Sequence, residues 1–482
     1  MNPLVIKKLN SISKTGNLFY LFDTKADWNQ LNLSKNELAY VSKKLEKKDG
    51  QAIAINQYNR WVFLVDTHSE KDQYIQLEKA RKVGAEIAAR LNVAGEDTIT
   101  ILDEANKPEI AAAVAEGMAL GNYQFSKHIN KKKDFKANSL QSIGIFSKGL
   151  SSEQVEEIKV ISEATLKARD LVNEPVNFLN AVQLAKEAEK LGKAAGFKTE
   201  VLDKKRIQSL KMGGLLSVNL GSLEPPTFTI MEYKPKGAIN KKPVVLVGKG
   251  VVYDTGGISL KPTSSMDTMK CDMAGAAAVI GTMYAIASAK LKVHVVGLVP
   301  ATDNRPDGKA YVPGDIITIS DGTTIEVLNT DAEGRLILAD ALVYAKQYKP
   351  ELVIDLATLT GAAMVAIGKY GTVMMGNASD EQKSALKNSG NQVYERIAEF
   401  PFWDEYADLL KSEIADMKNI GGPIAGAITA GKFLQHFTDY PYIHLDIAGP
   451  AFIDSKEGYL TKGGTGVGVR LLFDFLKNYQ AR

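Results

Sequence analysis

The sequence predicts an α/β protein with a large C-terminal domain, built on a mostly parallel sheet flanked by helices, and a smaller N-terminal α/β domain. Three observations lead to this prediction. The chain has 482 residues, which exceeds the roughly 100–200 residues usual for one domain. Short apolar runs rich in β-branched residues alternate with helical stretches along both regions. The pattern of strand-like and helical runs changes near residue 150.

The N-terminal domain is expected to cover residues 1–150. Its predicted strands are Phe19–Phe22, Trp61–Val65, Thr98–Leu102 and Ser142–Phe146, and its predicted helices include Ser34–Lys47 and Glu78–Leu91. The Lys- and Glu-rich runs between the strands are interpreted as solvated helix faces. Because no cluster of side chains in this region indicates chemistry, we expect it to be an accessory domain.

A connecting helix is expected over residues 151–174. Ser151 and Ser152 precede a helical pattern that runs through Glu153–Leu171. Pro175 disfavours the α conformation in the residue before it, so the helix should end at that point.

The C-terminal domain is expected to cover residues 175–482. Its predicted buried strands are Phe228–Glu232, Val244–Val247, His294–Val299, Leu352–Leu356 and Ile443–Ile447, and its predicted helices include Met273–Ala289 and Gly334–Ala345. Strands separated by helices indicate a mostly parallel sheet with helices on both faces. In such sheets ligands bind beyond the carboxyl ends of the strands, so the site should lie there.

The composition narrows the possible functions. A net charge of +3 indicates neither a nucleic acid nor a membrane partner. Cys271 is the only cysteine, which excludes an intrachain disulfide and a thiolate metal cluster. The five histidines show no HExxH spacing, so any metal site must be built mostly from carboxylates. The N-terminus lacks the apolar core of a signal peptide, and no apolar run reaches the roughly 20 residues that span a bilayer. We therefore expect a cytoplasmic protein.

The first segment that indicates chemistry is Val244–Gly257, where an apolar strand leads into a glycine-rich loop with Lys249 and Asp254. A phosphate-binding P-loop is excluded, because Walker A needs Ser or Thr after its lysine and Gly250 follows here. A plain turn is the remaining structural alternative. A buried lysine could instead lose its proton and act as a ligand, since desolvation lowers the pKa of an amine.

The second segment, Lys261–Gly275, places Asp272 just before an apolar helix. Taken alone, an acid at this position is more often a helix cap than a metal ligand. Lys261 taken alone would be read as a surface lysine.

The third segment, Leu328–Leu336, carries the most weight. Asp331, Glu333 and Arg335 alternate and lead into a helix, and an extended backbone would point the two acids the same way. Two convergent carboxylates repel unless a cation neutralises them, and oxygen ligands suit Mg, Mn or Zn. Acidic capping of the helix is again the alternative. Together, however, the three segments collect four acids, two lysines and an arginine at predicted strand–helix junctions.

These segments resemble the leucyl aminopeptidases, the family of cytosolic leucine aminopeptidase and bacterial aminopeptidase A. The motifs that carry the resemblance are Asn329–Leu336, the glycine-rich loop Gly248–Gly257, Lys261, Met269–Met273, Ala357–Gly361, Ile420–Gly431, His444–Gly449 and the domain entry Asp170–Asn177. The similarity extends over residues 165–470. Tyr253 departs from the phenylalanine that many relatives have before the aspartate, and Cys271 is interpreted as a packing residue.

The resemblance implies a two-metal site with Mn²⁺ or Zn²⁺. One ion would be bound by Lys249, Asp254, Asp272 and Glu333, and the other by Asp254, Asp331 and Glu333. The free α-amine of the substrate would take an open metal position. Lys261 would donate to the oxyanion, and Arg335 would hold a bicarbonate that serves as general base. Met269, Asn329, Thr358 and Gly361 would bind substrate, with Met269 and Thr358 in the first side-chain pocket.

The expected activity is therefore the metal-dependent release of N-terminal leucine and other mainly apolar residues from peptides, by a homohexamer. The N-terminal domain would support the hexamer, an assignment that rests on its position alone. A nucleic-acid-binding regulator is the second hypothesis; the balanced charge and the lack of a recognisable DNA-binding motif stand against it. A catalytically dead scaffold is the third, and the complete set of candidate ligands argues against it.

Overall fold

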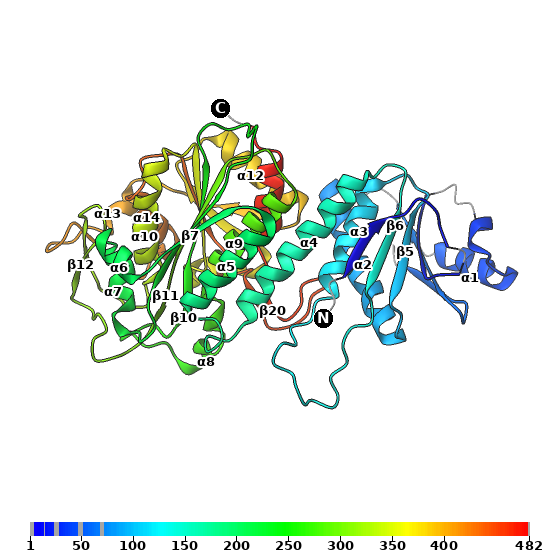
Figure 1. The fold of residues 1–482 in the computed structure, drawn as a ribbon, viewed down its shortest axis with the longest axis horizontal. Helices are drawn as coiled ribbons and strands as arrows, with labels where there is room; N and C mark the ends of the chain where they lie inside the picture. The colour runs from blue at the N-terminus through cyan, green and yellow to red at the C-terminus, as the bar shows by residue number, and fades with distance from the viewer. Residues whose placement is uncertain (1–3, 14, 24–27, 47–51, 68–71, 481–482) are drawn as a thin grey trace. The chain divides into compact units, whose positions relative to one another are not determined.

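A computed structural model describes residues 4–13, 15–23, 28–46, 52–67 and 72–480 of the chain (Figure 1). The chain forms two compact units. The N-terminal unit comprises residues 1–163 and 455–461, and the C-terminal unit comprises residues 164–454 and 462–482. The boundary falls within helix α4 (Ser152–Asn173), so the helix predicted as a separate connector contributes to both units.

The N-terminal unit is built on a sheet with the strand order β1-β6-β5-β2-β4-β3. Its elements are β1 (Val5–Lys8), β2 (Leu18–Phe22), α1 (Lys35–Leu45), β3 (Ile53–Asn56), β4 (Trp61–Asp66), α2 (Gln73–Ala94), β5 (Thr98–Asp103), α3 (Pro108–Gly121) and β6 (Ser142–Phe146). All neighbouring strands are parallel except β3 and β4. The four predicted strands correspond to β2, β4, β5 and β6, which confirms an α/β unit in this region.

Helix α1 shows why the sequence predicts its start well. Ser34 accepts a hydrogen bond from the Glu37 backbone, and the Glu37 side chain accepts one from the Ser34 backbone, which forms a capping box. The helix ends at Leu45, two residues before the predicted end, and Lys47 itself lies outside the described residues.

The C-terminal unit is built on a larger, mostly parallel sheet, and nine strands belong to it in the part of the chain that the structure describes. They are β7 (Lys198–Leu202), β8 (Thr227–Tyr233), β9 (Val244–Gly248), β10 (Gly250–Asp254), β11 (Val295–Asn304), β14 (Leu352–Ala357), β15 (Thr372–Gly376), β16 (Ile397–Glu399) and β18 (Tyr442–Asp446). The central strands β11, β9, β14 and β18 run parallel. Strands β7 and β8 on one side and β15 on the other introduce antiparallel pairs.

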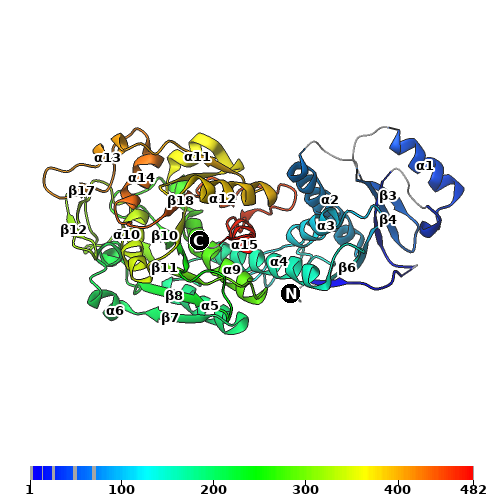
Figure 2. The ribbon, with the colours of Figure 1, turned by 90° about the horizontal axis from the view of Figure 1, so that it is seen from above.

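Helices cover both faces of this sheet, as the alternation of strands and helices predicts (Figures 1 and 2). After α4, the α-helices of the unit are α5 (Ala181–Ala195), α6 (Lys204–Ser209), α7 (Gly213–Val218), α8 (Thr263–Met266), α9 (Ala274–Ser288), α10 (Gly334–Ala345), α11 (Gly361–Ile367), α12 (Asp380–Gln392), α13 (Glu405–Asp408), α14 (Gly426–Gln435) and α15 (Val469–Lys477). Helices α5 and α9 pack on one face, and α10 and α14 pack on the other. Val245 and Val247 of β9 share a buried core with Leu336 and Ile337 of α10.

Two small sheets complete the unit. Their strands are β12 (Ile316–Thr318), β13 (Thr324–Glu326) and β17 (Met417–Lys418) in one, and β19 (Phe452–Ile453) and β20 (Gly463–Gly464) in the other. One described segment, Thr263–Ser288, is long and apolar enough to span a membrane by length and composition, but 89% of its tested window is buried inside the protein. That burial is the property of a core helix, here mainly α9.

Candidate metal centre

The predicted ligand segments meet at the carboxyl ends of the central strands, where an α/β sheet usually binds its ligand. Lys249 stands between β9 and β10, and Asp254 is the last residue of β10. Asp272 lies in a 3₁₀ turn, Met269–Met273, directly before α9. Glu333 is the N-cap residue of α10.

The buried half of the cluster contains three carboxylates around one ammonium group. Oxygen atoms of Asp254, Asp272 and Glu333 lie within 4.8 Å of one another. The Nζ atom of Lys249 is 2.8 Å from both oxygens of Asp272 and 2.9 Å from Glu333 Oε1. These side chains are almost inaccessible to solvent, with Glu333 only 1% exposed. The structure therefore brings together one complete set of the predicted ligands.

Lys261 and Asp331 form the more accessible half. Lys261 Nζ lies 2.8 Å from Asp254 Oδ2 and also pairs with Asp331. The side chain of Asp331 is 31% exposed, and that of Lys261 is 16% exposed. Substrate would therefore approach from this side of the cluster.

Burial and mutual repulsion disfavour the charged forms of these acids and raise their pKa values. Burial is the main reason why the pKa of Asp272 is raised well above its usual range, against the effect of Lys249. Burial likewise raises the pKa of Asp331 to about 6, with a further contribution from the charge of Asp254. The pKa of Glu333 is also raised, again chiefly by burial.

The two lysines are held as cations by the neighbouring acids. Burial lowers the pKa of Lys249, but the surrounding carboxylates outweigh burial and raise it above the usual value. The same balance raises the pKa of Lys261. Among these protein groups alone, therefore, the carboxylates and not burial determine the protonation of Lys249.

The donor set fits divalent cations. Four carboxylates (Asp254, Asp272, Asp331 and Glu333) face two ammonium groups (Lys249 and Lys261), which leaves an excess of two negative charges. Within the described part of the chain, the buried oxygen Glu333 Oε2 has no hydrogen-bond partner. Oxygen ligands with uncompensated charge are what Mg²⁺, Mn²⁺ and Zn²⁺ prefer.

The backbone that carries Asp331 and Glu333 is not extended. Thr330 and Asp331 form a turn, and Glu333 already has helical angles of φ −72° and ψ −36°. A turn and a helix start place Asp331 beside Lys261 and Glu333 beside Lys249. The sequence predicts their convergence, but the assumed extended geometry is wrong.

Gly334 is needed because the lysine passes close to the start of α10. A Cβ atom at this position would lie 2.3 Å from Lys249 Cε, which leaves no room for a side chain. The glycine after Glu333 in the third segment therefore has a packing role.

Arg335 lies at the edge of the cluster, in the first turn of α10. Its Nη1 donates to the Asn419 carbonyl at 2.6 Å, and its buried Nε has no hydrogen-bond partner among the described residues. Burial lowers the pKa of Arg335 to about 10, and the charges of Glu333 and Asp446 act in the opposite direction. The guanidinium is therefore a fixed positive group beside the carboxylates.

The predicted substrate-binding residues lie around the same strands, and Met269 is part of the 3₁₀ turn that holds Asp272. Thr358 Oγ1 donates to Asp272 Oδ1 at 2.8 Å, and its carbonyl accepts a hydrogen bond from Lys249 at 3.0 Å. The Cα of Gly361 faces open space, since a Cβ there would meet no atom within 4 Å. Asn329 Oδ1 accepts a hydrogen bond from the Asp331 backbone at 2.8 Å.

Sequence reasoning missed several buried residues that fix the ligand-bearing loops. Asn304, Tyr311, Thr330 and Asn419 all hydrogen-bond within or next to the loop Leu328–Asp331. Thr330 lies inside the motif Asn329–Leu336, whereas Asn304, Tyr311 and Asn419 lie outside the motifs named above. The only available signal was the position of Asn304 just past a predicted strand end.

Cys271 is consistent with its interpretation as a packing residue. Burial raises the pKa of its thiol to about 12, so the thiol stays protonated at neutral pH.

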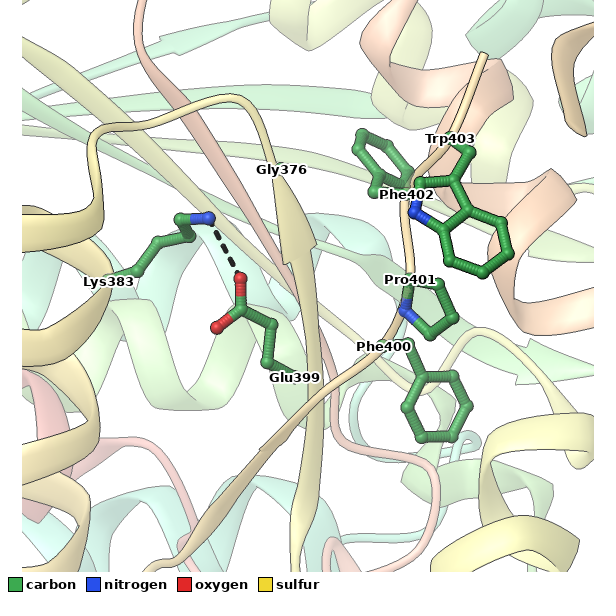
Figure 3. Close-up of a pocket in the computed structure, with 7 residues that line it drawn as sticks. All are labelled: Gly376, Lys383, Glu399, Phe400, Pro401, Phe402 and Trp403. Carbon is green, nitrogen blue, oxygen red and sulfur yellow. Dashed lines mark hydrogen bonds and ion pairs between the residues drawn. The ribbon is translucent and has the colours of Figure 1, made fainter. Parts of the chain in front are cut away.

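A separate cavity of about 510 Å³ contains none of the predicted site residues. It is lined by Gly376, Lys383, Glu399, Phe400, Pro401, Phe402 and Trp403. Figure 3 shows Lys383 pointing across to Glu399, with Nζ 2.8 Å from Oε1, while the aromatic residues lie along one extended run. The carboxylate cluster therefore remains the site with candidate chemistry.

Comparisons with known proteins show which family the chain resembles. Residues 166–473 match the model of the cytosol aminopeptidase family catalytic domain. A probable cytosol aminopeptidase from Chlorobaculum parvum is 47% identical over 428 residues and is matched over 84% of each chain. One from Chlorobaculum tepidum is 50% identical over 389 residues, which is 77% of this chain and 76% of the relative.

Two solved structures have the same fold over nearly their whole length. A mutant of tomato leucine aminopeptidase has a TM-score of 0.86 and 29% identity, with 99% of this chain and 97% of that chain covered. The bottromycin maturation enzyme BotP in complex with Mn has a TM-score of 0.84 and 30% identity, with 96% and 99% covered.

Proposed function

This chain belongs to the cytosol aminopeptidase family, and on that premise we propose that it uses two divalent metal ions to remove N-terminal residues from peptides. Membership of the family makes it a metal-dependent aminopeptidase and therefore a hydrolase that acts on peptides. The number of ions, the residues that bind them and the preference for apolar N-terminal residues are parts of the proposal.

The observation that carries the proposal is the buried triad of Asp254, Asp272 and Glu333, whose oxygens lie within 4.8 Å of one another. With Lys249 they form the first ligand set, and Asp254, Asp331 and Glu333 form the second. Bound ions would lower the pKa of a water molecule and polarise the scissile carbonyl. The manganese in the complex of the related enzyme BotP makes Mn²⁺ the first ion to test.

Lys249 needs a neutral amine to serve as a ligand. Its ammonium is stabilised here by carboxylates, and divalent charge beside those carboxylates would remove that stabilisation. Lys249 would then release its proton as the ions bind, and metal binding should release protons to the solvent.

Lys261 is proposed to stabilise the oxyanion of the tetrahedral intermediate. Its ammonium lies on the accessible side of the cluster, bound to Asp254 and Asp331. A cation fixed where negative charge develops lowers the barrier, and removing one such donor typically costs about 10²–10³-fold in kcat.

Arg335 is proposed to hold the anion that serves as general base, with bicarbonate as the candidate. The buried Nε of Arg335 is free to donate, while Nη1 is fixed by the Asn419 carbonyl. A planar guanidinium binds a planar carboxylate-like anion well. Met269, Asn329, Thr358 and Gly361 are proposed to receive the N-terminal residue of the substrate.

A cytoplasmic location and a homohexameric assembly complete the proposal. The relatives named cytosol aminopeptidase support the location. The N-terminal unit is proposed to support the assembly, and light scattering in solution would measure the assembly state.

The first experiment compares the hydrolysis of Leu-p-nitroanilide with that of its N-acetylated form. The protein is stripped of metal, and Mn²⁺ or Zn²⁺ is then added back. We expect cleavage of the free-amine substrate only, and only after metal is restored. Equal cleavage of the acetylated substrate would contradict an N-terminal exopeptidase, and full activity without metal would contradict the metal site.

A further inference from the structure

Asn304 is a buried polar residue next to the candidate ligands that the proposed chemistry does not use. It is the last residue of β11, has no exposed surface and pairs in register with Asp254 at the end of β10. Its backbone carbonyl accepts hydrogen bonds from Thr255 N at 3.0 Å and Thr255 Oγ1 at 2.8 Å. The residue directly after Asp254 is thereby tied to the end of β11.

The side-chain amide of Asn304 joins two segments that carry candidate ligands. Its Nδ2 donates to Asp254 Oδ1 at 2.9 Å and to the Thr330 carbonyl at 3.0 Å. Asp254 is one of the two proposed bridging ligands, with Glu333, and Thr330 directly precedes Asp331. Tyr311 donates a second hydrogen bond to the Thr330 carbonyl at 2.8 Å, so this carbonyl is held from two directions.

The chemistry of the two partners requires an amide at this position. Both Asp254 Oδ1 and the Thr330 carbonyl are acceptors, so the group between them must present two N–H donors. Aspartate has no such donors and would add negative charge to a cluster that already has an excess of it. A lysine would add a cation that competes with bound metal. Asparagine supplies two donors without a charge.

The amide fits a space that the loop Gly256–Gly257 leaves open. A Cβ atom at Gly257 would lie 2.8 Å from Asn304 Oδ1, and Gly257 has a positive φ of 64° that favours glycine. The TGG sequence after Asp254 therefore makes room for Asn304.

We propose that Asn304 is a positioning residue that sets the orientation of the Asp254 carboxylate and the place of the Asp331 loop before metal binds. This inference rests on the proposed two-metal function. Partners that orient metal ligands typically contribute 10–100-fold to metal affinity, because the ligands need not be reordered on binding.

The test is the Mn²⁺ affinity of Asn304→Leu, measured by calorimetric titration of metal-stripped protein. Leucine has nearly the shape of asparagine but no donor. We expect the affinity to fall by about 10–100-fold. At saturating Mn²⁺, kcat should fall while KM for Leu-p-nitroanilide changes little, because Asn304 has no exposed surface for a substrate to contact. If Asn304→Leu does not fold, Asn304→Ser serves the same purpose, since its hydroxyl is too short to join both partners.

Asn240, in the loop before β9, provides a matched control because it bonds to the backbone of His294, next to the other end of β11. It is also buried, and its Nδ2 donates to two backbone carbonyls, those of Lys242 and His294, each at 2.9 Å. Asn240→Leu should lower the thermal midpoint of the metal-stripped protein but leave its Mn²⁺ affinity within about twofold of the wild type. Equal losses of affinity in the two variants would show that general destabilisation is the cause and would overturn the proposal.

The wild-type protein separates this proposal from the proposed function. If wild-type protein neither binds Mn²⁺ nor cleaves the free-amine substrate, the proposed function fails. If the wild type does both and Asn304→Leu binds Mn²⁺ as tightly as the wild type, only the positioning role of Asn304 fails.

Discussion

Both carboxylate oxygens of Glu333 are buried, and few polar groups replace the water that they lose. Lys249 lies near Oε1, while Oε2 lacks a hydrogen-bond partner in the described part of the protein. The raised pKa of Glu333 shows that folding disfavours its charged form. A charged residue kept under these conditions is typical of a functional site, where stability is exchanged for activity.

Glu333→Gln should therefore separate folding from function. The amide keeps the shape of the side chain but removes the negative charge proposed to bridge the two ions. We expect Mn²⁺ affinity and turnover to fall by more than the roughly 100-fold that an orienting partner costs. The thermal midpoint of the metal-stripped protein should stay equal to or above that of the wild type. Titration calorimetry and thermal unfolding measure the two quantities.

The control for this prediction is Glu399→Gln, which neutralises a carboxylate that pairs with Lys383 and Lys387 outside the cluster. It should leave Mn²⁺ affinity unchanged. Wild-type turnover in Glu333→Gln would contradict the ligand assignment.

The sequence predicted the charged members of the site better than the neutral ones. Asp254, Asp272 and Glu333 stand at strand–helix junctions, where acids in three separate segments indicate a shared cation. Asn304 and Asn419 have no such signal, because an asparagine that joins two loops has no fixed spacing to either of them. Their roles depend on contacts between segments far apart in the chain, 26 residues for Asn304 with Thr330 and 90 for Asn419 with Asn329.

At the scale of elements, α10 is held in place by a buried acid in its middle. Asp340 has no exposed surface. Its Oδ2 accepts a hydrogen bond from Leu215 N in α7 at 2.9 Å, and its Oδ1 accepts one from Ser320 N at 2.9 Å. Asp340 therefore fixes the helix whose N-terminus carries Glu333 and Arg335.

Asp340→Asn should destabilise the protein in a pH-dependent way. An amide nitrogen cannot accept, so one backbone N–H loses its partner, which costs about 1–3 kcal/mol. Burial raises the pKa of Asp340 from 3.8 to about 7, so the native state holds a proton that the unfolded chain releases. The stability that this proton contributes is present below pH 3.8 and is lost as the pH rises to about 7. The deficit of the variant should therefore be larger at pH 5 than at pH 8 in urea unfolding.

Asp307→Asn is the control, because the side chain of Asp307 accepts one long hydrogen bond, 3.2 Å from Lys309 N, at an exposed turn. Its effect should stay within about 0.5 kcal/mol at every pH. A deficit of Asp340→Asn that grows between pH 5 and pH 8 would contradict the raised pKa.

The elements themselves followed closely from hydrophobic periodicity. The predicted helix Gly334–Ala345 has the observed bounds of α10, and the predicted strand at Val244–Val247 is one residue shorter than β9. The strand predicted at His294–Val299 is too short, because β11 continues through Pro300 to Asn304. Proline usually ends a strand pattern, but Pro300 lies where β11 pairs with β8 on one side and β10 begins only at the next residue on the other.

At the scale of the whole molecule, the two units have separate cores. The core of the N-terminal unit is formed by side chains such as Phe19, Phe63 and Ile101. All the candidate ligands belong to the C-terminal unit. The sequence indicated two domains from the change in the pattern of strand-like and helical runs, but it did not reveal that residues 455–461 return to the N-terminal unit, where Tyr459 donates to Glu78 at 2.8 Å. A short segment of this kind has no periodicity that would assign it to a core.

This division predicts where bound metal stabilises the chain. A ligand that binds only the native state adds about 2.7 kcal/mol at 100 times its dissociation constant. In hydrogen exchange with Mn²⁺ at that concentration, the most protected amides of β9, β10 and α10 should exchange about 100-fold more slowly, because they open only when the C-terminal unit unfolds. Amides of β2, β4 and β5 should keep their exchange rates.

Glu333→Gln protein with Mn²⁺ is the control and should show no change in either unit. An equal gain in both units would contradict independent unfolding of the two cores, and no gain in β9, β10 and α10 would contradict a metal site between them.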